Sequence, residues 1–184
     1  MYYVMTCDSL LPRTTIREHP ELPRGPWKTG RRIDYPVEQP VRYALDPDYP
    51  GVMLPMYKAN APLFRDDLLK ALEEAGVDNL ELFQAVLRDP KTGKAYGEYK
   101  AVNVVGLVAA ADSGRSEVAE GWEAGLFDTL FETLVVDEAV AGELLLFRLA
   151  ESVSAIVVHE NVKRTVEAAE IPGMTFHPSG EWSG

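Results

Sequence analysis

The sequence has little cysteine and little histidine. Cys7 is the one cysteine among 184 residues, so no disulfide can form within the chain, which is typical of a reducing compartment. The three histidines, His19, His159 and His177, lie far apart, and none neighbours a cysteine. No zinc-ligand spacing is present, and we expect no metal site.

Long apolar segments are also missing. No run approaches the ~20 apolar residues that a membrane helix requires. The first residues, MYYVMTCDSLLPR, have no basic region ahead of an apolar one, so we expect no secretory signal. Together with the single cysteine, these absences predict a cytoplasmic protein.

Signatures of catalysis are absent too. The sequence contains no glycine-rich phosphate loop of either common kind. The segment His159–Lys163 begins like a zinc-protease helix but has no second histidine four residues on, and Asp112–Ser116 lacks a nucleophile-elbow pattern. We therefore expect no catalytic residue and no cofactor. A pair of catalytic carboxylates cannot be recognised from sequence, so a small-molecule enzyme remains an alternative.

Acidic side chains, by contrast, are abundant and clustered. The 18 basic and 29 acidic residues give a net charge of −11. Residues 1–44 carry a net +2, whereas residues 112–143 hold nine carboxylates and only Arg115, a net −8. Such a surface repels nucleic-acid phosphates and attracts basic partners. The alternative is a solvated acidic face that only keeps the protein soluble.

Prolines divide the chain into two parts. Most of the thirteen prolines lie between residues 11 and 62, where they disfavour long helices and central strands. We expect residues 1–60 to form an irregular proline-rich arm with a short strand at Val41–Leu45. Trp27, Tyr35 and Tyr43 would pin this arm onto an α+β body over residues 61–178, and the whole chain, 1–184, would be one domain.

Apolar periodicity predicts the elements of this body. One helix is expected within residues 61–79 and another within 159–171, the latter with Val162, Val166 and Ala169 buried. Strands are expected at Leu80–Leu87 and Tyr96–Asp112, paired as an antiparallel hairpin in which Gly106 marks a bulge or a close backbone approach. Further strands are expected over residues 130–136 and 144–150, joined by a turn. The predicted fold is α+β, a mainly antiparallel sheet covered by two helices, with the proline-rich N-terminal arm.

Arg148 interrupts the apolar run ELLLFRLAES. Neither side of the expected strand is polar, so this permanent cation is expected to be at least partly buried. A buried guanidinium requires carboxylates or carbonyl groups in a forked geometry. We expect a structural ion pair with one of three carboxylates, and a contribution from the polar residue inside the preceding strand, Asn103. The three candidates are Asp112, Glu151 and Glu160. The less favoured interpretation is an arginine that binds a substrate or a partner.

Several of these segments, taken in order, resemble one bacterial family. They include PWKTGRRI, GVDNLELF, VNVVGLVAAAD, LVVDE with GELLLFRLAE, and IVVHENVKRTVE before GMTFHP. The pattern is similar to the immunity-protein family of polymorphic toxin systems, which is named for a myxobacterial immunity protein and was formerly a domain of unknown function. Its strongest pieces contain the four residues that we single out as a structural motif: Trp27, Gly30, Asn103 and Arg148.

The resemblance implies a non-enzymatic inhibitor that binds a cognate secreted toxin. The acidic segment suits a toxin with a basic surface, and a nuclease is a natural target of this kind because it must bind phosphates. No nucleic acid and no membrane is expected as a partner. A monomer and a homodimer remain open, as does a homodimeric adaptor that pairs through a strand edge. The candidate partner-binding residues are Asp112, Arg115, Glu117, Glu120, Trp122, Glu123 and Asp128.

Overall fold

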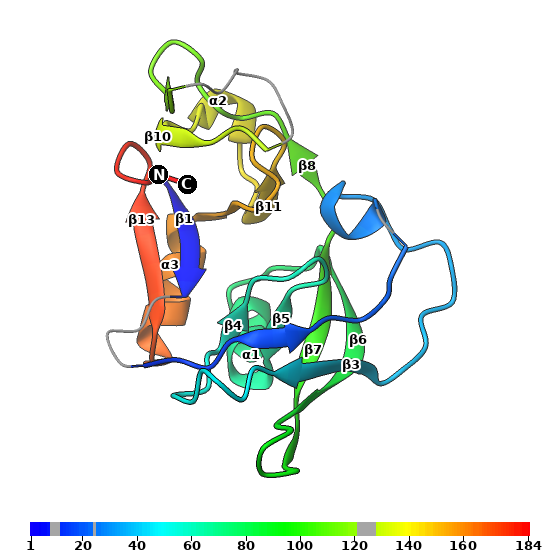
Figure 1. The fold of residues 1–184 in the computed structure, drawn as a ribbon. Helices are drawn as coiled ribbons and strands as arrows, with labels where there is room; N and C mark the ends of the chain where they lie inside the picture. Colours follow the sequence, from blue (N-terminus) through cyan, green and yellow to red (C-terminus); the bar gives the residue numbers. More distant parts are fainter. Residues whose placement is uncertain (8–11, 24, 121–127) are drawn as a thin grey trace.

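The protein is built around two sheets (Figure 1). The computed structural model describes residues 1–7, 12–23, 25–120 and 128–184. The five-stranded sheet has the order β13 (Met174–Pro178), β1 (Tyr2–Cys7), β12 (Ile156–His159), β11 (Leu146–Leu149), β8 (Leu107–Val108). The six-stranded sheet has the order β2 (Ile16–Glu18), β3 (Val41–Leu45), β6 (Leu80–Arg88), β7 (Ala95–Val104), β5 (Leu63–Arg65), β4 (Met56–Tyr57). A separate ribbon pairs β9 (Glu117–Val118) with β10 (Phe131–Thr133).

The fold class α+β is confirmed, but the predicted single sheet and two helices are not. The strand pairs are mostly antiparallel; the pairs β3–β6 and β11–β8 are parallel. The described residues contain three short α-helices, α1 (Asp66–Glu74), α2 (Glu138–Ala141) and α3 (Glu160–Ala168), and one 3₁₀ turn, η1 (Pro26–Lys28). Helix α2 lies where we expected only a turn. Its N-cap is Asp137, whose side chain accepts hydrogen bonds from the backbone N–H groups of Ala139 and Val140.

The structure does not confirm a separate proline-rich arm over residues 1–60. Strand β1 lies between β13 and β12, and β3 lies between β2 and β6, so both strands are internal to their sheets. The prolines of this region fall in the connections and in η1, and none lies within β1 to β5. Proline therefore separates these short strands without removing a donor from a ladder. Proline content describes the connections and does not locate the strands between them, so composition alone could not place β1 and β3.

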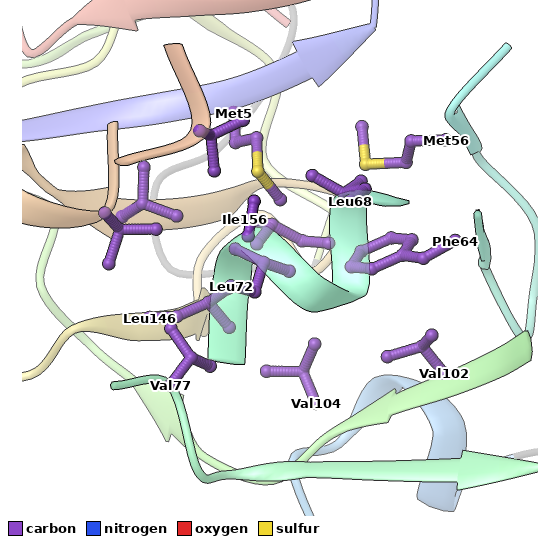
Figure 2. Packing of buried hydrophobic residues seen from close by; sticks show 14 of the residues in the cluster. Met5, Met56, Phe64, Leu68, Leu72, Val77, Val102, Val104, Leu146 and Ile156 are labelled. Atoms are coloured by element: carbon purple, nitrogen blue, oxygen red, sulfur yellow. The ribbon is translucent and has the colours of Figure 1, made fainter. Parts of the chain in front are cut away.

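Helices α1 and α3 pack together between the two sheets. Helix α1 lies against β5 and β7, and α3 lies against β12 and β1. Their buried stripes include Leu68 and Leu72 in α1 and Val162 and Val166 in α3, as predicted. Ala169 is exposed, since the helix has ended at its C-cap there. Figure 2 shows the central cluster in which these helices join the sheets: Phe64, Val102 and Val104 come from the six-stranded sheet, and Met5, Leu146 and Ile156 come from the other.

Side chains that alternate along each strand supply two further clusters on the outer faces. In β1, Tyr3 and Met5 face the central cluster, while Tyr2 and Val4 face the other way. The outer face of the five-stranded sheet is covered by side chains from two parts of the chain, which are Ala110, Phe131, Leu134, Val136 and Ala141, and Trp182 near the C-terminus. The outer face of the six-stranded sheet is covered by residues from the proline-rich region, including Trp27.

The predicted hairpin is confirmed, but its second strand divides between the sheets. Strand β7 pairs with β6 and ends at Val104. Gly106 has a φ of 131°, a conformation that side chains disfavour, and the chain then enters β8, which pairs with β11 in the other sheet. An apolar run of period two does not reveal such a crossing. Gly106 was the one signal in the sequence that pointed to it.

Candidate functional site

The described parts of the acidic segment 112–143, residues 112–120 and 128–143, lie over the outer face of the five-stranded sheet. Strand β10 and helix α2 come from this segment, and both contribute buried residues to the cluster beneath it (Figure 1). Most of its described carboxylates are exposed to solvent: Glu117, Glu120, Asp128, Glu132, Glu138 and Glu143. Trp122 and Glu123, two of the predicted contact residues, lie outside the described part of the chain.

Asp112 and Arg115 form a closed local turn. One Asp112 oxygen, Oδ1, accepts hydrogen bonds from the backbone N–H groups of Gly114 at 2.9 Å and Arg115 at 3.1 Å. The other, Oδ2, accepts from Arg115 Nε at 2.6 Å. The Arg115 side chain, followed by the backbone N–H of Gly114, lowers the pKa of Asp112 below its ordinary value. The one cation of this segment is thus already paired, which leaves the surrounding carboxylates to set the charge of the face.

Three apolar side chains in this segment or directly after it, which the sequence pattern did not single out, are also exposed. Leu130 is 38% exposed, Val140 is 52% exposed and Leu144 is 43% exposed. Phe131, in contrast, is only 4% exposed and belongs to the core. Val140 and Leu144 could have been identified as exposed from the sequence, because they lie among the carboxylates of α2 and its C-terminal flank. A face that combines aliphatic groups with carboxylates can both attract a basic protein and exclude water from the contact.

Trp27 and Gly30 hold the η1 segment against the six-stranded sheet. The Trp27 side chain is 2% exposed; its Nε1 donates to the Tyr35 hydroxyl at 2.6 Å, and its ring lies 5.2 Å from that of Phe83. The Gly30 carbonyl accepts from the backbone N–H of Gly106 at 2.9 Å. Gly30 has a φ of 67°, and a Cβ atom there would lie 2.6 Å from the backbone nitrogen of Leu107. Only glycine fits this approach to the β7–β8 crossing without strain.

Asn103 fixes the same segment from within β7. Its side chain is fully buried, and Nδ2 donates to the Arg31 carbonyl at 2.7 Å and to Glu81 Oε2 at 2.8 Å. Glu81 Oε2 also accepts from the backbone N–H of Ile33 at 2.8 Å. The predicted sharing of a network between Asn103 and Arg148 is therefore wrong. Asn103 and Glu81 are cross-strand neighbours on β7 and β6, and they bind the backbone of residues 31–33.

Arg148 is buried as predicted, but the expected ion pair is absent among the described residues. The side chain is 4% exposed, and Nη1 donates to the Val153 carbonyl. Nε and Nη2 are buried and have no hydrogen-bond partner in the described part of the chain. Burial lowers the pKa of the guanidinium to about 10, which leaves it charged at neutral pH. None of the candidates Asp112, Glu151 and Glu160 forms a salt bridge with it. Arg148 alternates with Phe147 and Leu149, so it faces the space between the two sheets, as Leu146 does.

A pocket of about 320 Å³ opens beside Arg148, between the two sheets. Met5, Met56 and Ile156 of the central cluster form its apolar wall (Figure 2). Its other side chains come mainly from η1, from the connection between β4 and β5 and from residues 153–154. They include Lys28, Lys58, Asn60 and Ser154, and His19 reaches it from the end of β2.

Neither a metal site nor a membrane span is found among the described residues. No group of three or more His, Cys, Asp or Glu side chains is placed to hold a metal ion there. No helix in that part of the chain has the length and apolar character needed to cross a membrane.

The contacts described above do not by themselves identify a function, but comparison with known families identifies the family to which the chain belongs. The model of the Immunity protein family (Imm11) matches residues 9–181, nearly the whole chain. The chain belongs to the Imm11 family. The match includes the Trp27–Gly30 segment, Asn103, Arg148 and the acidic segment, and membership indicates a function in toxin immunity. A search of curated proteins found no match.

Proposed function

We propose that this Imm11 protein is a cytoplasmic inhibitor that neutralises a cognate secreted toxin by binding it stoichiometrically, without catalysis. Family membership is the observation that carries the proposal. The producing cell would make the protein together with the toxin and would be protected, along with its kin, by the complex.

The acidic segment 112–143 is the surface that we assign to the toxin. Its exposed carboxylates would accelerate encounter with a basic target, and Leu130, Val140 and Leu144 would be buried on docking. A standard interface covers about 800 Å² on each partner, so residues beyond the exposed carboxylates must also take part. Trp122 and Glu123 remain candidates within it. A nuclease is the toxin class that this charge favours, since a phosphate-binding surface is basic.

Charge reversal on this face tests the assignment. We expect Glu117→Lys, Glu120→Lys and Asp128→Lys, combined in one variant, to weaken binding to the toxin by about tenfold to a hundredfold, mainly through a slower association rate. The binding partner is the product of the neighbouring open reading frame, and surface plasmon resonance at two salt concentrations gives both rates.

A matched variant controls for total charge. Glu18, Glu21 and Glu98 are exposed residues outside the acidic segment. Their combined replacement by lysine changes the net charge equally and should alter the affinity much less. If both triple variants weaken binding to the same extent, the partner does not dock on the 112–143 face.

The alternative of a small-molecule enzyme called for a pocket with converging Asp, Glu and His side chains. The pocket beside Arg148 is lined by one histidine, His19, and by no Asp or Glu among the described residues. This pocket therefore offers no carboxylate for acid–base chemistry, and family membership is the observation that favours the inhibitor.

A further inference from the structure

The pocket beside Arg148 is cationic in a protein of net charge −11. Arg148, Lys28 and Lys58 all line it, and no described Asp or Glu side chain does. Lys28 and Lys58 form no ion pair with any described residue, whereas Lys100 and Lys163, for example, pair with nearby carboxylates. The pocket therefore concentrates positive charge that no carboxylate in the described part of the chain neutralises.

Arg148 has an unused hydrogen-bonding edge. Nη1 is held by the Val153 carbonyl, while Nε and Nη2 have no acceptor among the described residues. In the planar guanidinium these two nitrogens present parallel N–H groups, the fork that binds both oxygens of a carboxylate. A buried cation without a counter-ion lowers the stability of the folded protein. Such a group is retained more readily when a ligand supplies the missing negative charge and hydrogen-bond acceptors.

The remaining wall of the pocket suits an apolar tail. Met5, Met56 and Ile156 are labelled in Figure 2 as members of the central cluster, and they also line the pocket. Nε and Nη2 of Arg148 are buried, so a ligand must displace part of the pocket lining to reach them. Met5 and Met56 belong to that lining, and methionine is unbranched and adapts its shape easily. The volume of about 320 Å³ lies within the range of small-molecule sites.

We infer that this pocket binds a small organic carboxylate with an aliphatic tail. The carboxylate pairs with Nε and Nη2 of Arg148, Lys28 and Lys58 add attraction at the opening, and the tail lies against Met5, Met56 and Ile156. The site is separate from the acidic 112–143 face, and the inference does not depend on the identity of any toxin.

Sodium hexanoate is the probe for this site, and hexanol at constant ionic strength is the matched uncharged compound. For the full chain we expect a saturable rise in melting temperature of roughly 3–5 °C at ten times the dissociation constant. Hexanol should give a much smaller rise. Shifts of backbone amide resonances should saturate together at the pocket residues. No saturable response up to the millimolar range, or an equal response to hexanol, would overturn the inference.

Substitutions then locate the bound carboxylate. Arg148→Met should weaken hexanoate binding roughly tenfold to a hundredfold, because two charge-assisted hydrogen bonds are lost. Lys58→Ala, at an exposed position that tolerates replacement, should weaken it several-fold and serves if Arg148→Met does not fold. Lys94→Ala removes an equal charge on the distant β6–β7 hairpin and should have no effect. Equal binding by wild type and Lys58→Ala, or by wild type and Arg148→Met, would place hexanoate elsewhere.

The carboxylate that binds Arg148 could also belong to an acidic side chain of another protein. N-acetylglutamate methylamide, which has a short side-chain carboxylate and peptide groups, distinguishes such a protein ligand from a small aliphatic carboxylate. Tighter binding of hexanoate supports the aliphatic carboxylate. Binding of the glutamate derivative without binding of hexanoate would overturn it and assign the pocket to a protein ligand.

Discussion

Gly30→Ala is expected to lower the free energy of unfolding by about 3 kcal/mol. A positive φ costs an L-residue about 1–2 kcal/mol, and forcing a methyl group into a packed site typically costs about 1–3 kcal/mol more. The new Cβ would lie 2.6 Å from Leu107 N and 2.7 Å from the Gly106 carbonyl carbon. Both atoms are backbone at the crossing between the sheets, so neither can move away cheaply. Urea unfolding followed by tryptophan fluorescence measures the difference.

Gly93→Ala separates the two costs. Gly93 has a φ of 74°, similar to that of Gly30, but no neighbouring atom lies within 4 Å of the position that a Cβ would occupy there. This variant should lose only the conformational part, about 1–2 kcal/mol. Were Gly30→Ala to cost no more than Gly93→Ala, the close approach of the η1 segment to the β7–β8 crossing would be refuted.

Arg148→Met is expected to leave the fold intact and to raise the free energy of unfolding by about 1–3 kcal/mol. The ion pair expected from the sequence would imply the opposite result, a loss of about 3–5 kcal/mol, because the substitution would leave the partner carboxylate buried and unpaired. In the structure no described carboxylate pairs with Arg148, so methionine replaces an uncompensated buried cation by an apolar group among Met5, Met56 and Ile156. The lost hydrogen bond to the Val153 carbonyl offsets part of this gain.

Thermal and urea unfolding in a buffer free of carboxylates provide the measurement. Arg164→Met is the matched control. Arg164 is an exposed residue of α3 that hydrogen bonds to the Asn161 side chain, and its replacement should change stability by no more than about 0.5 kcal/mol. A loss of several kcal/mol in Arg148→Met alone would show that the guanidinium has a strong partner within the folded chain.

Local patterns in the sequence were sufficient for part of the fold. The stripe of Leu68 and Leu72 in α1, the β6–β7 hairpin and the succession of β12 and α3 are all local in sequence. Other features depend on distant residues. The crossing at Gly106 depends on the pairing of β8 with β11. The internal position of β1 depends on its pairing with β12 and β13, which lie at the far end of the chain.

The contacts of Arg148 and Asn103 also divide into features that are local in the sequence and features that depend on distant residues. Burial of Arg148 follows from its apolar neighbours along one strand, but its acceptor, the Val153 carbonyl, is a backbone atom that no side-chain pattern identifies. Likewise, Asn103 could be recognised as an unusual polar residue in an apolar strand, while its partners Glu81 and Arg31 required the register of β6 and the path of η1. The order of motifs along the chain was more informative about function than any of these contacts, and the family match confirms the resemblance.

Co-expression with the neighbouring open reading frame tests the central proposal most directly. The neighbour's product is expressed in a susceptible host alone, with this chain, and with the combined Glu117, Glu120 and Asp128 lysine variant. We expect the product to arrest growth alone, the wild-type chain to restore growth and to co-purify with the product as a one-to-one complex, and the variant to protect less well. A toxic product that this chain neither binds nor neutralises would contradict the proposal.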